Sequence, residues 1–199
     1  MKHIFNHKEK FLILICGLPG TGKTTKARAL YEGLDGYVLV DQNEIRRKHG
    51  IKRMPKTQDE VLREIDRLTA GFLNKGKGVI FESGNRYSFR RHQMYGVASG
   101  CGRRVVTLEI VCGEELAKKR IRARPPGDGL ISDPTDPVVY DRIKKLWEDV
   151  TTDFKYPGED HVSYAQFNTE TQTLYPIVTQ KGMKGFWGAL QRVLKQKYA

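Results

Sequence analysis

Short runs of consecutive apolar residues alternate along the chain with segments in which apolar residues recur every three or four positions. Uninterrupted apolar runs are typical of strands that are buried on both faces of a parallel sheet, whereas the longer period indicates amphipathic helices. We predict five such strands, at residues 11–16, 37–40, 79–81, 105–111 and 162–167. Because strands and helices alternate, the chain is predicted to fold as βαβ units around a parallel sheet.

The predicted helices have recognisable start and stop signals. One helix spans residues 23–34, and the next begins at a capping box formed by Thr57 and Glu60. Further helices are predicted at residues 88–99 and 114–124, at a start marked by Asp136, and at residues 182–197, where the apolar positions make the helix amphipathic. We therefore expect one α/β domain over residues 1–199, with three layers, a five-stranded parallel sheet and helices on both faces.

A glycine-rich sequence separates the first strand from the first helix. It reads Gly17-Leu18-Pro19-Gly20-Thr21-Gly22-Lys23-Thr24 and matches the phosphate-binding pattern G-x-x-x-x-G-K-[ST]. Backbone N–H groups of such a loop surround phosphate oxygens, and the helix N-terminus adds a favourable potential. Lys23 can reach the β- and γ-phosphates, the Thr24 hydroxyl is placed to bind Mg²⁺, and Thr25 lies toward the α-phosphate. The sequence therefore predicts a P-loop NTPase-type fold that binds ATP and Mg²⁺.

The charge of the chain favours an anionic partner. Lys and Arg outnumber Asp and Glu by 35 to 23, giving a formal net charge of +12. The excess is clustered in two segments, residues 46–56 and 118–124, which is more than a uniformly basic surface would show.

The cysteines and the apolar runs bear on where the protein works. Cys16, Cys101 and Cys112 lack zinc-ligand spacing and indicate a reducing compartment. No apolar stretch approaches the roughly 20 residues that a membrane span needs. We therefore expect a cytoplasmic protein without a membrane contact, and the sequence leaves its oligomeric state open.

The order of the motifs resembles that of P-loop kinases of the polynucleotide kinase, adenylylsulfate kinase and gluconate kinase group. In that group a D-x-[DN]-x-x-R-like pattern follows the second strand, and Asp41, Asn43 and Arg46 occupy similar positions here. Asn85 is similar to an asparagine in the turn after the third strand. The resemblance covers roughly residues 11–150 and implies a kinase with a mobile lid, which falls at about residues 118–136.

The resemblance also implies a carboxylate that accepts the proton of the acceptor hydroxyl, and an arginine, Arg46, that holds the acceptor. We assign Asp41 as this base because open α/β sheets bind ligands at the carboxyl ends of their strands. Polynucleotide kinases carry an Asp where this chain has Asn43, and an amide cannot act as a base. Glu44 is therefore an alternative base, and capping of the following turn is an alternative role for Asp41.

Three further groups complete the predicted site. Glu82 ends the third strand, where P-loop proteins place an acidic residue near Mg²⁺. Arg120 and Arg124 resemble the lid arginines of the same kinases, and their spacing places them on one helical face, where both can bind ATP phosphates. Arg90 or its neighbour Arg91 is a candidate acceptor contact. For Arg90 and for the lid arginines, a solvated basic helix face is the alternative interpretation.

The sequence thus predicts an ATP-dependent kinase that phosphorylates a hydroxyl of an anionic acceptor. A 5′-hydroxyl of RNA or DNA is the first candidate, because the basic cluster at residues 46–56 lies where such kinases bind the acceptor. One alternative is a small-molecule kinase acting on adenylylsulfate, a nucleoside, a nucleotide or a sugar. The other is a non-catalytic ATP-binding module, which Asn43 favours and which Asp41 and Glu82 disfavour.

Overall fold

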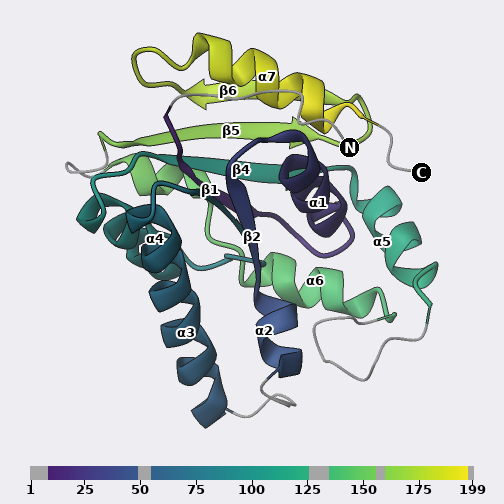
Figure 1. Cartoon of the computed structure of the whole chain (residues 1–199). Coiled ribbons are helices and arrows are strands. Elements are labelled where there is room, and N and C mark those ends of the chain that lie inside the picture. The colour runs from purple at the N-terminus through teal and green to yellow at the C-terminus, as the bar shows by residue number, and fades with distance from the viewer. Residues whose placement is uncertain (1–8, 49–54, 126–134, 156–159, 197–199) are drawn as a thin grey trace.

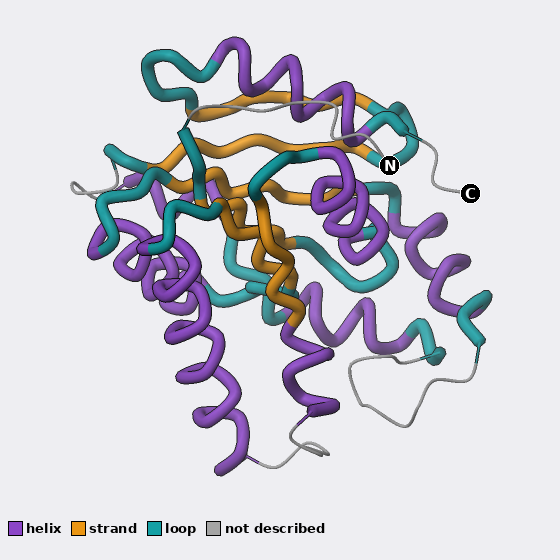
Figure 2. Tube along the Cα trace, in the orientation of Figure 1, coloured by secondary structure: helices purple, strands orange, loops and turns teal. Residues whose placement is uncertain are grey.

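The protein is built around one mixed β-sheet. The computed structural model describes residues 9–48, 55–125, 135–155 and 160–196. Within these residues six strands form the sheet, in the order β2-β3-β1-β4-β5-β6. Helices cover both faces of the sheet, as the ribbon in Figure 1 and the tube in Figure 2 show. The predicted three-layer α/β architecture is therefore confirmed.

The five predicted strands are present and run parallel. They are β1 (Leu12–Cys16), β2 (Tyr37–Asp41), β3 (Gly78–Glu82), β4 (Val105–Val111) and β5 (Val162–Asn168). The register of β2 against β3 pairs Asp41 with Glu82. Two carboxylates therefore end neighbouring strands at the same edge of the sheet, which is the edge where ligands bind in open parallel sheets.

A sixth strand, β6 (Thr173–Val178), was not predicted. It pairs antiparallel with β5 at the border of the sheet, so the described sheet is six-stranded and mixed, where the sequence had predicted five parallel strands. Pro176 lies inside β6. A proline weakens the sequence signal for a strand because it cannot donate a ladder hydrogen bond, and a strand at the sheet border tolerates it.

The helices largely follow the predicted ranges. They are α1 (Lys23–Gly33), α2 (Gln42–Lys48), α3 (Pro55–Asn74), α4 (Ser88–Gly100), α5 (Glu114–Arg122), α6 (Val138–Lys145) and α7 (Lys184–Leu194), with the 3-10 helix η1 (Val150–Lys155) between α6 and β5. The short helix α2 was missed. Several boundaries also differ from the prediction: α3 begins two residues before Thr57, α5 ends two residues before Arg124, and α7 begins two residues after residue 182.

The alternation of β1 divides the core into two halves. Ile13 and Ile15 belong to the cluster that includes α1 and α7, whereas Leu12 and Leu14 belong to the cluster that includes α3 and α4. All four side chains are fully buried. Successive side chains of a strand point to opposite faces, so a run that is apolar at every position needs a helical layer on each side.

The C-terminal helix completes one of these layers. Phe186, Leu190 and Val193 on α7 are fully buried in the cluster that contains α1. A Cβ atom on Gly33 of α1 would lie within 2.6 Å of Val193, so the two helices approach closely at this glycine. The amphipathic pattern of α7 is therefore explained by packing within the chain.

Some predicted features lie outside the described residues. They are residues 126–134, in the middle of the predicted lid, and Lys52 and Arg53 of the first basic cluster.

Candidate functional site

The loop between β1 and α1 has the backbone conformation that its glycines permit. Gly17 and Gly20 have φ angles of 141° and 79°, which side-chain-bearing residues rarely adopt. A Cβ atom at Gly17 would collide with the carbonyl oxygen of Ile110, and one at Gly20 with that of Ala117. The loop therefore lies directly against β4 and α5, with its backbone N–H groups and the N-terminus of α1 forming the start of an anion site.

Lys23 lies folded over this loop. Its Nζ donates a hydrogen bond of 2.9 Å to the carbonyl oxygen of Leu18, the second residue of the motif. Burial lowers the pKa of the Lys23 ammonium, and the nearby Glu82 carboxylate opposes that change. A half-buried ammonium group at the wall of a cavity is well placed to gain phosphate oxygens as partners.

Thr24 and Glu82 offer a place for a divalent cation. The Thr24 hydroxyl lies 3.4 Å from Glu82 Oε1, and Glu82 is almost fully buried. Its Oε2 atom has no hydrogen-bond partner among the described residues, and burial raises the pKa of its carboxyl. A buried carboxylate oxygen without a partner beside a hydroxyl fits the oxygen ligands that Mg²⁺ prefers.

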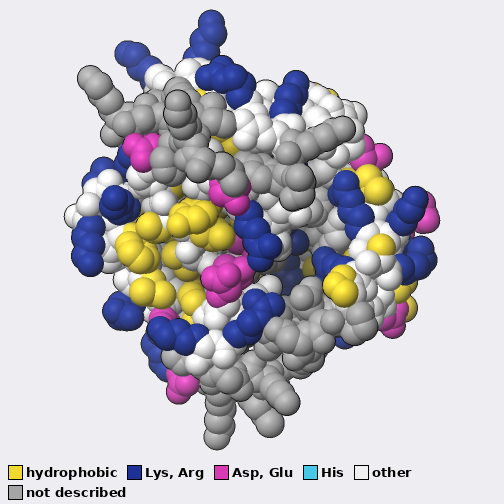
Figure 3. Space-filling view, turned by 45° about the vertical axis from the view of Figure 1, so that its right-hand side comes forward, with side chains coloured by type: hydrophobic (Ala, Val, Ile, Leu, Met, Phe, Trp, Pro, Cys, Tyr) yellow, Lys and Arg dark blue, Asp and Glu magenta, His cyan; other side chains and the backbone are white. Residues whose placement is uncertain are grey.

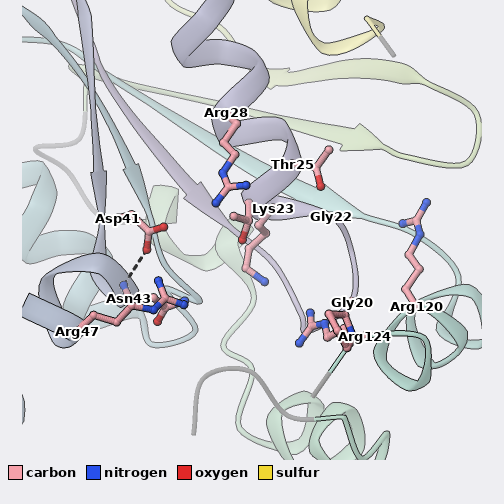
Figure 4. A pocket seen from close by; sticks show the side chains of 12 residues that line it. Gly20, Gly22, Lys23, Thr25, Arg28, Asp41, Asn43, Arg47, Arg120 and Arg124 are labelled. Atoms are coloured by element: carbon pink, nitrogen blue, oxygen red, sulfur yellow. Dashed lines mark hydrogen bonds between the residues drawn. The ribbon is translucent and has the colours of Figure 1, made fainter. Parts of the chain in front are cut away.

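Asp41 lies on the other side of the same cavity. The cavity has a volume of about 430 Å³ and is lined by Gly20, Gly22, Lys23, Thr24, Thr25, Arg28, Asp41, Asn43, Arg47, Arg120, Arg124 and Pro125. Figure 4 shows the Lys23 side chain pointing into the space between Asp41 and Arg124, with Arg28 reaching toward it from α1. One Asp41 oxygen accepts a hydrogen bond of 2.7 Å from the backbone N–H of Asn43, which orients the carboxylate.

Arginines surround this cavity. Figure 3 shows Lys and Arg side chains gathered beside a recess in the middle of the molecular face. Five of the lining residues are cationic, and Asp41 is the one carboxylate among the described residues that line the cavity. The electrostatic potential of the cavity therefore favours anions.

The lid arginines have separate positions. Arg120 Nη1 donates to the hydroxyl of Thr169 at 2.9 Å and approaches the carbonyl oxygen of Thr21 at 3.3 Å, so Arg120 is held against the phosphate loop. Arg124 lies beyond the end of α5, and Figure 4 shows its side chain on the Lys23 side of the cavity. Both residues line the cavity, but they do not share one helical face, because α5 ends before Arg124.

Three predicted acceptor residues do not line the cavity. Arg46 is absent from its lining, and its neighbour Arg47 lies there instead. Asn85 is buried and donates from Nδ2 to the carbonyl oxygen of Ile15 at 2.7 Å, ahead of the phosphate loop. Arg90 is also buried and forms a two-pronged ion pair with Asp66. Asn85 and Arg90 thus have structural partners in place of an acceptor.

Sequence reasoning missed three residues of the site. Arg28 lies one helical turn beyond Thr24 on α1, so the spacing of four residues could have revealed it. Arg47 depended on α2, which was not predicted. Thr169 follows β5 and bonds to the loop residue Thr21, which is 148 residues distant in sequence, and no local pattern indicates such a contact.

Comparison with known proteins identifies the family. A protein-family model described as an AAA domain matches residues 12–145, which is more than half of the chain. The chain therefore belongs to this family, whose description specifies no reaction. A search of curated proteins found no match.

Solved structures of similar fold include kinases of the group that the motifs had suggested. A gluconokinase from Sinorhizobium meliloti aligns over 94% of this chain and 93% of that chain, with 17% identity and a TM-score of 0.53. The APS kinase CysC of Mycobacterium tuberculosis, in complex with AMPPNP and APS, aligns over 96% and 100%, with 12% identity and a TM-score of 0.55. These likenesses confirm the P-loop kinase fold.

A chain from the Pnkp1/Rnl/Hen1 RNA repair complex also aligns, over 71% of this protein, with 18% identity and a TM-score of 0.55. The protein spans only 47% of that chain, and 42% of the chain matched in a second structure of Pnkp1/Rnl/Hen1.

Within the described residues, no helix has the length and apolar character needed to cross a membrane.

Proposed function

We propose that the protein is an ATP-dependent kinase that transfers the γ-phosphoryl group to a hydroxyl of an anionic acceptor. The observation that carries this proposal is that one cavity is lined both by the phosphate-loop residues Lys23 and Thr24 and by the carboxylate of Asp41. Phosphoryl transfer depends on positioning the two substrates and on neutralising charge, with a carboxylate to accept the hydroxyl proton.

Asp41 is the base in this proposal. It ends β2, lines the cavity and has one oxygen fixed by the N–H of Asn43. Glu44, the alternative carboxylate, is exposed and is not among the residues that line the cavity. Because a general base must come within hydrogen-bonding reach of the proton that it accepts, this arrangement supports Asp41 over Glu44.

The cationic residues bind the two anionic substrates. Lys23, Arg120 and Arg124 lie on the phosphate-loop side and would hold the ATP phosphates, whereas Arg47 lies with Asp41 on the acceptor side. Thr24 and Glu82 would hold Mg²⁺, which when bound neutralises charge on the phosphate oxygens. The buried Glu82 oxygen without a partner supports that assignment.

A 5′-hydroxyl of RNA or DNA is the first candidate acceptor. The basic cavity and the net charge of +12 favour a polyanion, and one structure of similar fold belongs to an RNA repair complex. A small anionic metabolite is the second candidate, because the APS kinase aligns with nearly the whole chain.

The direct test is transfer of labelled γ-phosphate from ATP–Mg²⁺ to single-stranded 5′-hydroxyl RNA and DNA. Label should appear on the oligonucleotide and fall by at least about 100-fold in Lys23→Ala, which lacks a cation at the transferred group. Lys119→Ala, at an exposed position on α5, is the control and should retain activity. Failure of the wild-type protein to label any oligonucleotide, with ATP binding intact, would remove the polynucleotide acceptor.

Asp41→Asn tests the assignment of the base. We expect turnover to fall by about 100- to 10,000-fold with little change in ATP affinity, because the base acts in the chemical step. Glu44→Gln should behave like wild type. If Glu44→Gln lost turnover and Asp41→Asn kept it, the assignment would be wrong.

A further inference from the structure

Two aromatic rings stack where the loop after β3 passes into α4, the half-buried Tyr87 and the exposed Phe89 in the first turn of the helix. The rings of Tyr87 and Phe89 lie 5.7 Å apart, with an angle of 25° between their planes. The guanidinium group of Arg86 lies over the Tyr87 ring at 4.5 Å. Phe89 is 60% exposed, although a phenylalanine side chain gains free energy when it leaves water. An exposed phenylalanine ring that already stacks on a tyrosine, with an arginine nearby, is suited to stacking against a further flat ring.

This loop leaves the sheet next to the proposed acceptor side of the cavity. It follows Glu82, which is paired in register with Asp41. Ser83 at the start of the loop donates from its hydroxyl to the side chain of Gln42, the first residue of α2. Further along, Arg86 accepts a hydrogen bond from the N–H of Glu148, which follows α6. Figure 1 shows α2 and α6 beyond this edge of the sheet, so the loop lies at the same end as the cavity.

A buried ion pair holds the loop in one conformation. Arg91 and Asp153 are both fully buried, and their side chains are joined by two hydrogen bonds of 2.6 and 2.8 Å. Arg91 also donates to the carbonyl oxygens of Asn85 and Arg86, at 3.1 and 3.2 Å. Burying two charges carries a large desolvation cost, and here the pair fixes the backbone from which the aromatic stack projects. The two rings therefore project from a backbone that the buried pair holds in place.

We propose that Arg86, Tyr87 and Phe89 form a stacking surface for the nucleobases of a single-stranded polynucleotide whose 5′ end enters the cavity. This inference rests on the proposed kinase function and specifies its acceptor. Stacking on an aromatic side chain is available to every base, so the surface would bind strands with little sequence preference. The arginines of the cavity would meet the backbone phosphates near the 5′ end.

Binding of a fluorescein-labelled single-stranded RNA with a 5′-hydroxyl end tests the inference without phosphoryl transfer. We expect Phe89→Ala to weaken binding by about 5- to 100-fold, the range for loss of one aromatic stacking partner. Phe89→Tyr should bind the RNA about as tightly as wild type, because tyrosine keeps the aromatic ring. Tyr175→Ala, which removes a ring that is 49% exposed on β6, is the matched control and should bind like wild type.

An RNA with abasic sites at its first nucleotides separates stacking from charge. This RNA should bind the wild-type protein more weakly, and Phe89→Ala should then cause no further loss. The inference would be overturned if wild type and Phe89→Ala bound the intact RNA with equal affinity. It would also be overturned if Phe89→Ala weakened binding of the abasic RNA as much as binding of the intact RNA.

The transfer assay distinguishes this inference from the kinase proposal. If wild type labels the RNA and Phe89→Ala does so with an unchanged KM, the kinase function stands and the stacking surface is wrong. If wild type labels no oligonucleotide but binds RNA in a Phe89-dependent way, the stacking surface stands and the catalytic proposal fails.

Discussion

Two strand-to-helix loops lie at the same edge of the sheet and are stabilised in different ways. Long-range bonds from Arg120 and Thr169 reach the β1–α1 loop at the carbonyl oxygen of Thr21. Its shape, however, follows from its glycines and from short-range interactions, such as the bond from Lys23 to the carbonyl oxygen of Leu18, five residues earlier. The β3–α4 loop is held by long-range ones, because Asp153 lies 62 residues beyond its partner Arg91. Both loops also contain residues with positive φ, namely Gly17, Gly20 and Gly22 in the first and Asn85 in the second.

This contrast shows which kinds of site can be recognised from a sequence. A loop whose conformation follows from glycines and from neighbours in sequence has a recognisable pattern. A loop that depends on a buried ion pair between distant residues has no such pattern, because either residue alone resembles an ordinary charged side chain. Three substitutions can test whether the two loops are held as described.

The largest effect is expected when the support of the β3–α4 loop is broken. Asp153→Asn should lower the free energy of unfolding by about 3–5 kcal/mol, since it leaves the Arg91 guanidinium buried without a counter-charge. Urea denaturation would measure the loss. Asp66→Asn is the matched control, because Asp66 pairs with Arg90, the residue next to Arg91, but has a side chain that is 32% exposed. We expect this variant to lower the free energy of unfolding by about 1 kcal/mol. Equal losses would contradict the role assigned to burial.

A smaller effect is expected when the glycine loop is changed. Gly20→Ala should destabilise the protein by about 1–3 kcal/mol and weaken ATP binding, because the position has positive φ and no room for a Cβ atom beside Ala117. Gly71→Ala in α3 is the control, since a Cβ atom there meets nothing within 4 Å, and it should stabilise the helix by about 0.5–1 kcal/mol. ATP titration calorimetry and thermal denaturation would show both. Normal ATP affinity in Gly20→Ala would contradict the proposed geometry.

The smallest effect concerns Glu82, where β3 ends next to the glycine loop. Burial raises the pKa of the Glu82 carboxyl, so the folded protein binds its proton more tightly than the unfolded chain does. Stability due to this group is therefore lost as pH rises from the ordinary pKa of glutamate through the raised value. The glutamine side chain of Glu82→Gln cannot titrate. The free energy of unfolding of this variant, relative to wild type, should therefore increase as pH rises from the ordinary pKa of glutamate through the raised value.

Thermal denaturation between about pH 4 and pH 8 would measure this change, without nucleotide or metal. The exposed Glu44→Gln serves as the control. A difference between Glu82→Gln and wild type that stays constant with pH would show that Glu82 does not titrate in this range.

Sequence patterns alone were enough to locate the five parallel strands and the phosphate loop, but not β6. Apolar runs such as 11–16 predict strands because a strand buried on both faces must be apolar at every position, and this requirement is local. The loop motif is local for the same reason, since each glycine supplies a conformation where it stands. The position of Asp41 at the end of a strand also followed from the pattern, and β2 does end there.

Which charged residues contact one another depends on the tertiary structure. Neighbouring arginines have different positions, since Arg47 lines the cavity and Arg46 does not, while Arg90 and Arg91 are both buried with different acids. Local patterns do not distinguish such neighbours, because a contact between residues far apart in sequence depends on how helices pack and not on spacing along the chain. The exposure of Phe89 in its stack with Tyr87 is a further case, because burial belongs to the folded chain and not to the residue type.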